Sequence, residues 1–462
     1  MRKIEVAPDY IGLLKKFSNE DFEKLLRPEA TDLINRINEN YYYWDKIKYL
    51  KTPEGVTNEM LWAFVKIRRR SSPFKFKIGQ YSFYWFLSSR MQQLLHLFDM
   101  NIGGSLESRS LIPKDDKNRY LISSIMEEAI ASSQIEGAVT TRKQAKEMLR
   151  KNIPPKNRSE QMILNNYLTI QKILEIKDQD LTPELLLEVQ QYVSKETLES
   201  KEYEGSFRQS NDVNVVDVLD GEIVHSPPDH NEIKDLINEL CTFFNSDTSD
   251  PFIHPIVKGC IIHFLIGFIH PFVDGNGRTA RALFYWYLLK KGYWLTEYMS
   301  ISRLILRSKE QYARAFLYTE NDENDLSYFI GYNLRTMKLA FDSLREYIQR
   351  KLEEKKQVNE FIKLEGVNER QAQILKWFYE EPSLIMTVRE LETRMAIANQ
   401  TARNDLNGLV QLGYLSTIGM NKKLQAFARS SFFEQKIQIQ KKRTDRLLLN
   451  INTNQQRLKF DE

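Results

Sequence analysis

The sequence predicts a mainly helical protein that carries one small β-hairpin. Apolar residues recur at helical spacing over 120–137 and over 231–246, so each segment presents one apolar face to a core. Thr182 can cap a third helix, because a proline follows at the first helical position and a glutamate lies in the first turn. The hairpin is expected within 205–228, where residues typical of strands flank an Asp-Gly pair. We therefore expect a helical domain with one β excursion inside it.

Length and composition limit the class of protein. The chain has 462 residues, more than one compact domain usually holds, so two or three domains are expected. Hydrophobic residues make up 42% and charged residues 28%, which argues against a mainly disordered, collagen-like or membrane-spanning chain. Lys plus Arg total 66 and Asp plus Glu 62, a net charge of +4, so composition alone does not indicate nucleic acid binding.

The cysteines and the amino terminus bear on the compartment. Cys241 and Cys260 both lie in apolar helical patterns, which excludes a disulfide framework and a Cys-rich zinc site and favours a reducing compartment. Glu5 and Asp9 interrupt the amino terminus, which therefore does not resemble a secretory signal. The most apolar run, 260–269, contains a histidine and is too short to cross a bilayer. We expect a cytoplasmic protein.

Changes in composition divide the chain into five regions. Residues 1–112 are rich in Tyr, Trp and Phe and are expected to form packed helices with irregular connections. Residues 113–340 form the main helical domain. A charged helix with one apolar stripe, 341–367, is expected to connect it to residues 368–430, where three helices and a short β segment resemble a winged helix. The polar tail, 431–462, is expected to be a marginal or frayed helix.

Residues able to bind phosphate gather in one stretch, HPFVDGNGRTAR, at 270–281. Gly275, Asn276 and Gly277 can aim successive backbone N–H groups at one point at the start of the next helix, which forms an anion nest. Arg278 and Arg281 are three positions apart on that helix, so both can face the same polyanion. Gly-Asn-Gly alone would be an ordinary turn, and one arginine a solvated charge. Their joint occurrence favours a phosphate site.

The same stretch supplies an acid and a base. Asp274, beside the nest, can hold a Mg²⁺ ion that also binds phosphate oxygens. His270 is the only group of the stretch whose usual pKa lies near neutrality, which makes it the natural general base. His263 is seven positions away, about 10.5 Å along a helix, too far to share a zinc ion with His270. We assign His263 to the core and His254 to a helix start. A base, a metal carboxylate and a phosphate cradle together indicate attack on a nucleotide phosphate.

The stretch 270–281 matches the motif of the Fic family, H-x-F-x-[D/E]-G-N-G-R-x-x-R, at every specified position. The resemblance covers about residues 110–340 and implies a protein adenylyltransferase that moves AMP from ATP to a Tyr, Thr or Ser hydroxyl of a protein, with Mg²⁺. The Phe of the motif, Phe272, is expected to pack under the loop. The roles implied by the resemblance are proton acceptor for His270, metal ligand for Asp274, α- and β-phosphate binding for Gly275, Asn276 and Gly277, β-phosphate binding for Arg278 and γ-phosphate binding for Arg281.

Two further segments resemble the family. Gly205 to Pro228, which contains the predicted hairpin, resembles the flap that docks the target segment by strand pairing; the alternative is an ordinary surface hairpin. Ser132 and Glu136 match the inhibitory motif [S/T]-x-x-x-E-[G/N] at the end of the predicted helix 120–137. By resemblance, Glu136 pairs with Arg281 and so removes the arginine that would hold the γ-phosphate; the alternative is a solvated helix charge.

Two other functions compete with AMP transfer. The same residues permit the reverse reaction, in which water removes AMP from a modified protein. The second alternative is a DNA-binding regulator that acts through the winged helix. Between residues 387 and 429 there are six basic and three acidic residues, an excess of +3 that is modest for groove binding. The exposed face of the predicted third helix, 399–412, would equally suit protein docking or a homodimer, so we rank DNA binding lower.

Overall fold

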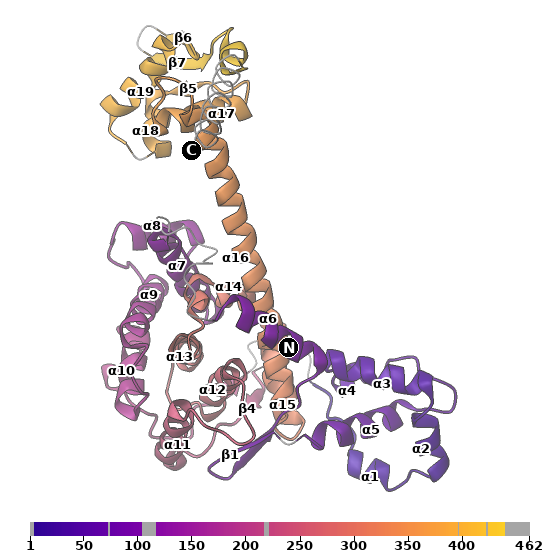
Figure 1. Ribbon diagram of the computed structural model, residues 1–462. Coiled ribbons are helices and arrows are strands. Elements are labelled where there is room, and N and C mark those ends of the chain that lie inside the picture. The colour runs from indigo at the N-terminus through magenta and orange to yellow at the C-terminus, as the bar shows by residue number, and fades with distance from the viewer. Residues whose placement is uncertain are drawn as a thin grey trace, which may run out of the picture. The chain divides into compact units, whose positions relative to one another are not determined.

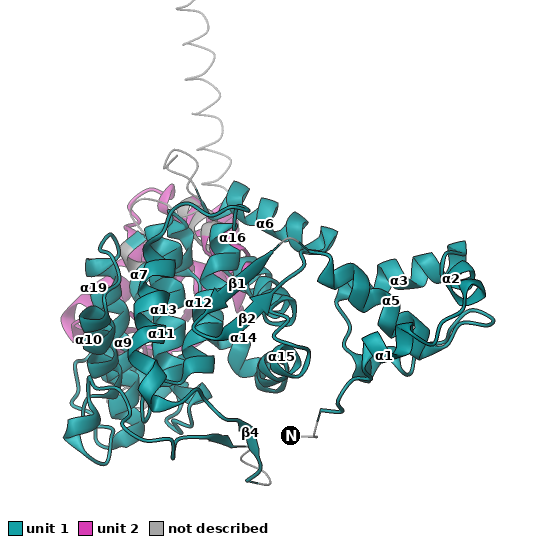
Figure 2. Cartoon of the chain, turned by 90° about the horizontal axis from the view of Figure 1, so that it is seen from below, with its two compact units in different colours: residues 1–344 teal, residues 345–462 magenta. Residues whose placement is uncertain are grey.

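A computed structural model describes the protein at residues 4–72, 74–103, 117–216, 221–395, 397–421 and 424–438. It divides into two compact units, residues 1–344 and 345–462, which are coloured separately in Figure 2. Helices predominate in both units (Figure 1). In the described part of the chain, no helix is both long and apolar enough to cross a membrane.

The amino-terminal region of the first unit contains the expected helices. It also contains a β-hairpin that was not predicted from the sequence. Strands β1 (Lys75–Ile78) and β2 (Tyr81–Tyr84) pair antiparallel across a two-residue turn in which Gly79 has a φ of 52°. Apolar residues alternate on both sides of that glycine, so the hairpin signal was present in a region that we expected to be helical with irregular connections. The helices here are α1 (Tyr10–Leu14), α2 (Asn19–Leu25), α3 (Pro28–Asn40), α4 (Trp44–Ile47), α5 (Asn58–Arg70) and α6 (Ser89–Asn101).

A buried ion pair and a buried hydrogen bond fasten this amino-terminal region to the rest of the first unit. The Lys66 ammonium, on α5, lies 2.7 Å from Asp322 Oδ1 and 2.7 Å from the Tyr84 hydroxyl. The Arg69 guanidinium, one turn later, donates to the Tyr328 hydroxyl at 3.0 Å. Both cations are buried, and a buried charge is tolerated only when it is paired.

The centre of the first unit is a pair of helices, α12 (Pro255–Ile269) and α13 (Asn276–Lys290), joined by residues 270–275. Figure 1 shows them side by side, with other helices around them. A Cβ atom at Gly259 would lie 3.3 Å from Leu288, so the glycine lets α12 approach α13 closely. The surrounding helices are α7 (Lys117–Ile135), α8 (Arg142–Arg150), α9 (Arg158–Ile176), α10 (Pro183–Ser194), α11 (Ile233–Asn245), α14 (Ile301–Arg307) and α15 (Lys309–Asn321), with short 3₁₀ turns at Lys201–Tyr203, His230–Glu232 and Trp294–Tyr298.

The predicted helices of this unit are present with small changes at their ends. Thr182 caps α10 and accepts a hydrogen bond from the Leu185 amide at 3.2 Å. The helix expected at 231–246 is α11, preceded by a 3₁₀ turn. The predicted hairpin consists of β3 (Val215–Val216) and β4 (Ile223–His225), which pair antiparallel. Residues 217–220, which hold the end of the predicted first strand and Asp220 of the predicted turn, lie outside the described residues.

Two histidines have the structural positions that were expected. His254 caps α12 by accepting from the Ile256 amide at 3.2 Å. His263 is 1% exposed, its Nε2 atom lies 2.9 Å from the Tyr312 hydroxyl, and its ring contacts Phe329 edge to face. Burial lowers the pKa of His263 to about 3. The ring is therefore neutral in the folded protein, as a packed core residue should be.

Replacing His263 with alanine is expected to destabilise the fold by about 2 kcal/mol, because it leaves a cavity and removes a partner of Tyr312. Between about pH 3 and the ordinary histidine value, the unfolded state binds this proton and the folded state does not, so His263 makes stability rise with pH. The free energy of unfolding of the His263→Ala variant should therefore fall less between pH 7 and pH 5 than that of the wild type. Urea unfolding at pH 5 and pH 7 measures both effects, and a fully stable but inactive variant would contradict the core assignment.

The second unit has a small three-stranded sheet and its own core. Its sheet order is β5-β7-β6, with all neighbours antiparallel. The core includes Leu375, Leu406 and Phe427. This order of helices and strands fits the predicted winged helix, which stays a prediction. The elements are α17 (Glu369–Glu380), β5 (Met386–Thr387), α18 (Val388–Met395), α19 (Asn399–Gln411), β6 (Leu415–Asn421) and β7 (Leu424–Arg429).

Two segments differ from their predicted form. The stretch expected as a connecting helix, 341–367, is largely the second half of α16 (Ser327–Ile362), a single helix that begins inside the first unit. The start of the polar tail is packed, because Phe433 and Ile437, four positions apart on one helical face, are buried in the core of the second unit. Residues 439–462 of that tail lie outside the described residues.

Candidate active site

The loop between α12 and α13 is held in a fixed shape by its own side chains. His270 ends α12 with a φ of 49°, and Gly275 precedes α13 with a φ of 87°. The Asn276 side chain accepts from the Phe272 amide at 3.0 Å and donates to the Phe272 carbonyl at 2.8 Å. The Phe272 ring is buried and stacks on Phe207, as expected for a residue under the loop. Asn276 therefore offers a ligand only its backbone N–H, since its side chain is already used.

His270 is arranged to accept a proton. Its Nδ1 atom lies 3.2 Å from the Gly267 carbonyl oxygen, which can only accept, so the proton of the neutral ring belongs on Nδ1. Burial lowers the pKa of His270 to about 4. Its Nε2 atom has no hydrogen-bond partner in the described part of the chain. Near neutral pH, the ring thus presents an unprotonated Nε2, which a general base requires.

The two arginines of the motif are buried and incompletely satisfied. Arg278 and Arg281 are 1% and 2% exposed. Arg278 donates to the Val193 carbonyl at 2.9 Å, while Arg281 donates to the Ser132 hydroxyl at 2.9 Å and the Ser132 carbonyl at 3.0 Å. Within the described residues, Arg278 Nε and Arg281 Nη1 have no hydrogen-bond partner. Buried guanidinium groups with unused donors are suited to an anionic ligand.

The Glu136 carboxylate lies against the start of α13. Its Oε1 atom accepts from Arg281 Nη2 at 2.9 Å. A Cβ atom at Gly277 would overlap Glu136 Oε1, so the carboxylate lies directly against the first turn of α13. Backbone N–H groups at a helix start attract anions, which explains why a carboxylate is stable there. The pairing that the resemblance implied for Glu136 and Arg281 is therefore present in the structure.

The end of α7 determines where Glu136 lies. The helix stops at Ile135, one residue before Glu136, so the range 120–137 expected for the inhibitory helix extends too far. Gly137 has a φ of 94°, a left-handed conformation that ends a helix without strain. Lys309, from the start of α15, donates to the carbonyl oxygens of Gln134 and Ile135 at 2.8 Å and 3.0 Å. Glu136 is thus presented from a turn that a distant lysine holds in place.

Asp274 is the one carboxylate of the loop, and it fits a metal ion that arrives with phosphates. Its side chain is 38% exposed, its Oδ1 atom accepts from the Gly275 amide, and its Oδ2 atom lies 3.4 Å from Arg278 Nη2. The described residues contain no group of three or more His, Cys, Asp and Glu side chains that could hold a metal ion. Mg²⁺ is commonly bound by one or two carboxylates together with substrate phosphates and water, so a single carboxylate fits.

Two buried polar residues join the loop to the flap. Arg208 donates from its backbone to the Pro271 carbonyl at 2.9 Å and from Nε to the His270 carbonyl at 3.0 Å, and its Nη1 atom reaches the Ser210 carbonyl. Gln190 bonds the Asp274 carbonyl at 3.2 Å and the Gly205 amide at 2.6 Å. Sequence reasoning assigned no role to Gln190 and none to Arg208 beyond its place at the flap. Their bonds hold the base of the flap against the loop.

A histidine of the flap also contacts the end of α12. His225 Nδ1 lies 2.7 Å from Glu320 Oε2, and its Nε2 lies 2.7 Å from the Phe268 carbonyl. Both partners are acceptors, so both ring nitrogens are donors and the ring is cationic. Burial by itself would lower the pKa of His225, but the bond to Glu320 raises it above its ordinary value. The flap strand β4 is thereby tied to the helix that ends at His270.

Comparisons with known proteins support the resemblance. Residues 180–288 match the model of the Fic/DOC family. Proteins named Protein adenylyltransferase Fic from Drosophila mojavensis and Drosophila grimshawi are 38% and 36% identical to this chain over 69 residues, 15% of this chain. The match spans only 14% of the length of these curated relatives.

A solved structure resembles the fold over a longer part of the chain. The crystal structure of a Fic family protein from Desulfovibrio desulfuricans covers 75% of this chain and 98% of its own, with a TM-score of 0.50 and 18% identity. At that identity, the likeness concerns the fold alone. The family model, the relatives and the fold agree with one another. Residues 180–288 thus match the Fic/DOC family, and the helical core that contains them has the fold of a Fic family protein.

Proposed function

We propose that the protein transfers AMP from ATP to a Tyr, Thr or Ser hydroxyl of a protein substrate and that Glu136 inhibits this activity. The observation that carries the proposal is the position of the Glu136 carboxylate, bonded to Arg281 at the start of α13, in the place suited to a phosphate. A neutral His270 lies at the opposite end of the same loop. The site thus combines a base with a phosphate cradle that an internal anion blocks.

Each residue answers one need of the reaction. His270 Nε2 takes the proton of the target hydroxyl, whose oxygen forms a bond to the α-phosphorus while the bond to pyrophosphate breaks. The backbone N–H groups of Gly275, Asn276 and Gly277 hold the α- and β-phosphates. The Gly275 N–H now donates to Asp274 Oδ1, so it has to give up that hydrogen bond first. Arg278 holds the β-phosphate and Arg281 the γ-phosphate. Asp274 would hold Mg²⁺, which would neutralise negative charge on the leaving pyrophosphate.

The proposal is tested by adding α-labelled ATP, GTP, CTP and UTP in parallel to a cell lysate that contains the full chain. We expect label on protein bands from ATP, with more label when Glu136 is replaced by glycine. Label carried at the γ position of ATP should not appear on protein, because pyrophosphate leaves. Transfer from a different nucleotide, or no transfer even by the Glu136→Gly chain, would contradict the proposal.

A second candidate function is the removal of AMP from a modified protein. Glu136 Oε1 is bonded to Arg281, but Oε2 has no hydrogen-bond partner in the described residues and could orient a water molecule. Incubating the chain with an AMPylated protein and measuring released AMP separates the two directions. Removal should require Glu136, whereas transfer should increase without it.

Replacing Asp274 with alanine is expected to lower AMP transfer by about 100-fold or more, since the loop has no second carboxylate and bound metal supplies several kcal/mol of stabilisation. The remaining activity should no longer depend on Mg²⁺ concentration. Asp274→Glu is the matched control, because the family motif allows either acid, and it should keep most activity. A Mg²⁺ titration of label incorporation measures both variants; full activity of Asp274→Ala in Mg²⁺ would refute the assignment.

A further inference from the structure

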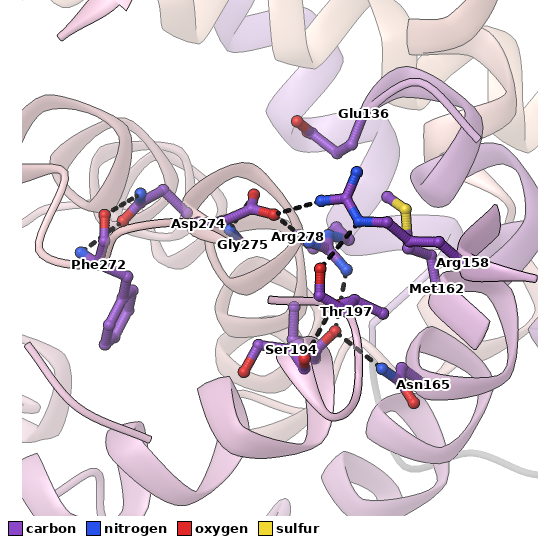
Figure 3. Close-up of polar contacts among 12 residues, drawn as sticks. Glu136, Arg158, Met162, Asn165, Ser194, Thr197, Phe272, Asp274, Gly275 and Arg278 are labelled. Carbon is purple, nitrogen blue, oxygen red and sulfur yellow. Dashed lines mark hydrogen bonds and ion pairs between the residues drawn. The ribbon is translucent and has the colours of Figure 1, made fainter. Parts of the chain in front are cut away.

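Arg158 is outside the motif, and only the fold brings it to the site. It is the first residue of α9, yet its Nη2 atom lies 3.2 Å from Asp274 Oδ2. Its Nε atom donates to the Thr197 carbonyl at 2.8 Å. Figure 3 shows the Arg158 guanidinium directed toward Asp274, on the side of the loop where Glu136 lies. The bond to Thr197 therefore aims this arginine at the loop.

The guanidinium of Arg158 can bind a second anion. It has five N–H donors, and its Nη1 atom has no hydrogen-bond partner among the residues that the structure describes. The side chain is 64% exposed, so it can turn without disturbing the core. Arg158 Nη2 and Arg278 Nη2 both contact Asp274 Oδ2, at 3.2 Å and 3.4 Å, and Arg281 Nη1 lies beside Gly277 in the first turn of α13. Three guanidinium groups thus converge on one region.

The charges at the site favour a polyanion. Arg158, Arg278 and Arg281 face two carboxylates, Asp274 and Glu136. When Glu136 leaves Arg281, Asp274 is the one carboxylate still in contact with any of these arginines among the residues that the structure describes. Phosphate groups of a nucleotide supply the missing negative charge and accept several N–H groups at once.

We propose that Arg158 is a third phosphate-binding arginine, which exchanges Asp274 for phosphate oxygens when a nucleoside triphosphate binds with Mg²⁺. This inference rests on the proposed function. Asp274 is the metal ligand in that function, and a Mg²⁺ ion at its carboxylate would repel the Arg158 guanidinium that now contacts it. The guanidinium is planar, so it turns as one group about the Cδ–Nε bond, with its Nε atom staying beside the Thr197 carbonyl and its terminal nitrogens moving toward the phosphates beside Asp274.

The test measures nucleotide affinity and not turnover. The full chain with Glu136→Gly, alone and combined with Arg158→Ala, is titrated calorimetrically with ATP and with AMP, in Mg²⁺ and in EDTA. We expect Arg158→Ala to weaken ATP binding in Mg²⁺ at least tenfold and in EDTA at most threefold. AMP, which brings no β- or γ-phosphate, should bind within twofold. Arg158→Lys should be intermediate, because lysine keeps the charge but not the fork of donors.

Arg150→Ala is the matched control, since Arg150 is exposed at the end of α8, and it should change no affinity. Unchanged or tighter binding of ATP in Mg²⁺ by the Arg158→Ala chain would overturn the proposal and leave Arg158 as a surface ion pair. An equal loss of ATP affinity in EDTA would contradict the proposal that Arg158 exchanges Asp274 for phosphate when Mg²⁺ binds. If the Glu136→Gly chain binds no ATP whether residue 158 is arginine or alanine, the proposed function itself fails, an outcome distinct from a failure of Arg158 alone.

Discussion

Replacing Glu136 with glycine is expected to raise AMP transfer, including self-modification, by about tenfold or more. The substitution removes the carboxylate that is bonded to Arg281 and lies against Gly277. The γ-phosphate of ATP can then bind Arg281, and the α-phosphate can adopt the in-line position that attack requires. Correct placement of the reacting atoms can be worth a factor of about 100 in rate. Incorporation of α-labelled AMP into protein measures the change.

Matched variants separate release of inhibition from other effects of the substitution. Glu136→Gln keeps the size of the side chain and removes its charge, so its transfer should lie between wild type and the glycine variant. Arg281→Ala should not be rescued by Glu136→Gly, because the γ-phosphate contact is missing in both chains. Since Glu136 lies beyond the end of α7, the glycine should cost less than the ~1 kcal/mol of a helix interior. No increase in transfer would end the inhibitory hypothesis.

Replacing His270 with alanine is expected to lower AMP transfer by a factor of about 1,000 or more while ATP affinity changes by only a few fold. The imidazole acts on the target hydroxyl and has no role in holding phosphates, so its loss should appear in turnover. Single-turnover labelling and nucleotide titration, both done in the Glu136→Gly chain, separate the two quantities. Retained transfer would contradict the role of general base.

The pKa of His270 also predicts a pH dependence. Burial favours the neutral ring and lowers the pKa to about 4, so the base stays unprotonated as pH falls from 8 to 5. Transfer should therefore not decline with a midpoint near 6.5, the ordinary histidine value, and the base should be lost only as pH approaches about 4. A titration of transfer rate against pH in the stable range of the protein checks this, and a midpoint near 6.5 would place His270 in contact with solvent.

Short-range signals explain what was predictable from the sequence. Thr182 caps α10 as expected, since a cap depends on residues within one turn. The loop from His270 to Arg281 was recognised because its nest, acid and arginines are contiguous, and the structure brings them together around the start of α13. The pair of Glu136 and Arg281 was expected only through the family resemblance, because no local rule links residues that lie 145 positions apart.

The tertiary structure alone decided which distant side chains complete the site. Arg158 reaches Asp274 across 116 positions, and Lys309 reaches the last carbonyls of α7 across 174 and 175. Neither residue stands out in sequence, because an exposed arginine or lysine on a helix usually serves only solubility. Neighbouring residues were enough to predict α7, α10 and α11, the cap at Thr182 and the chemistry of the loop. The ion pairs and hydrogen bonds that position the loop and the Glu136 carboxylate required the packing of α7, α9 and α15 around the loop, which depends on the whole core at once.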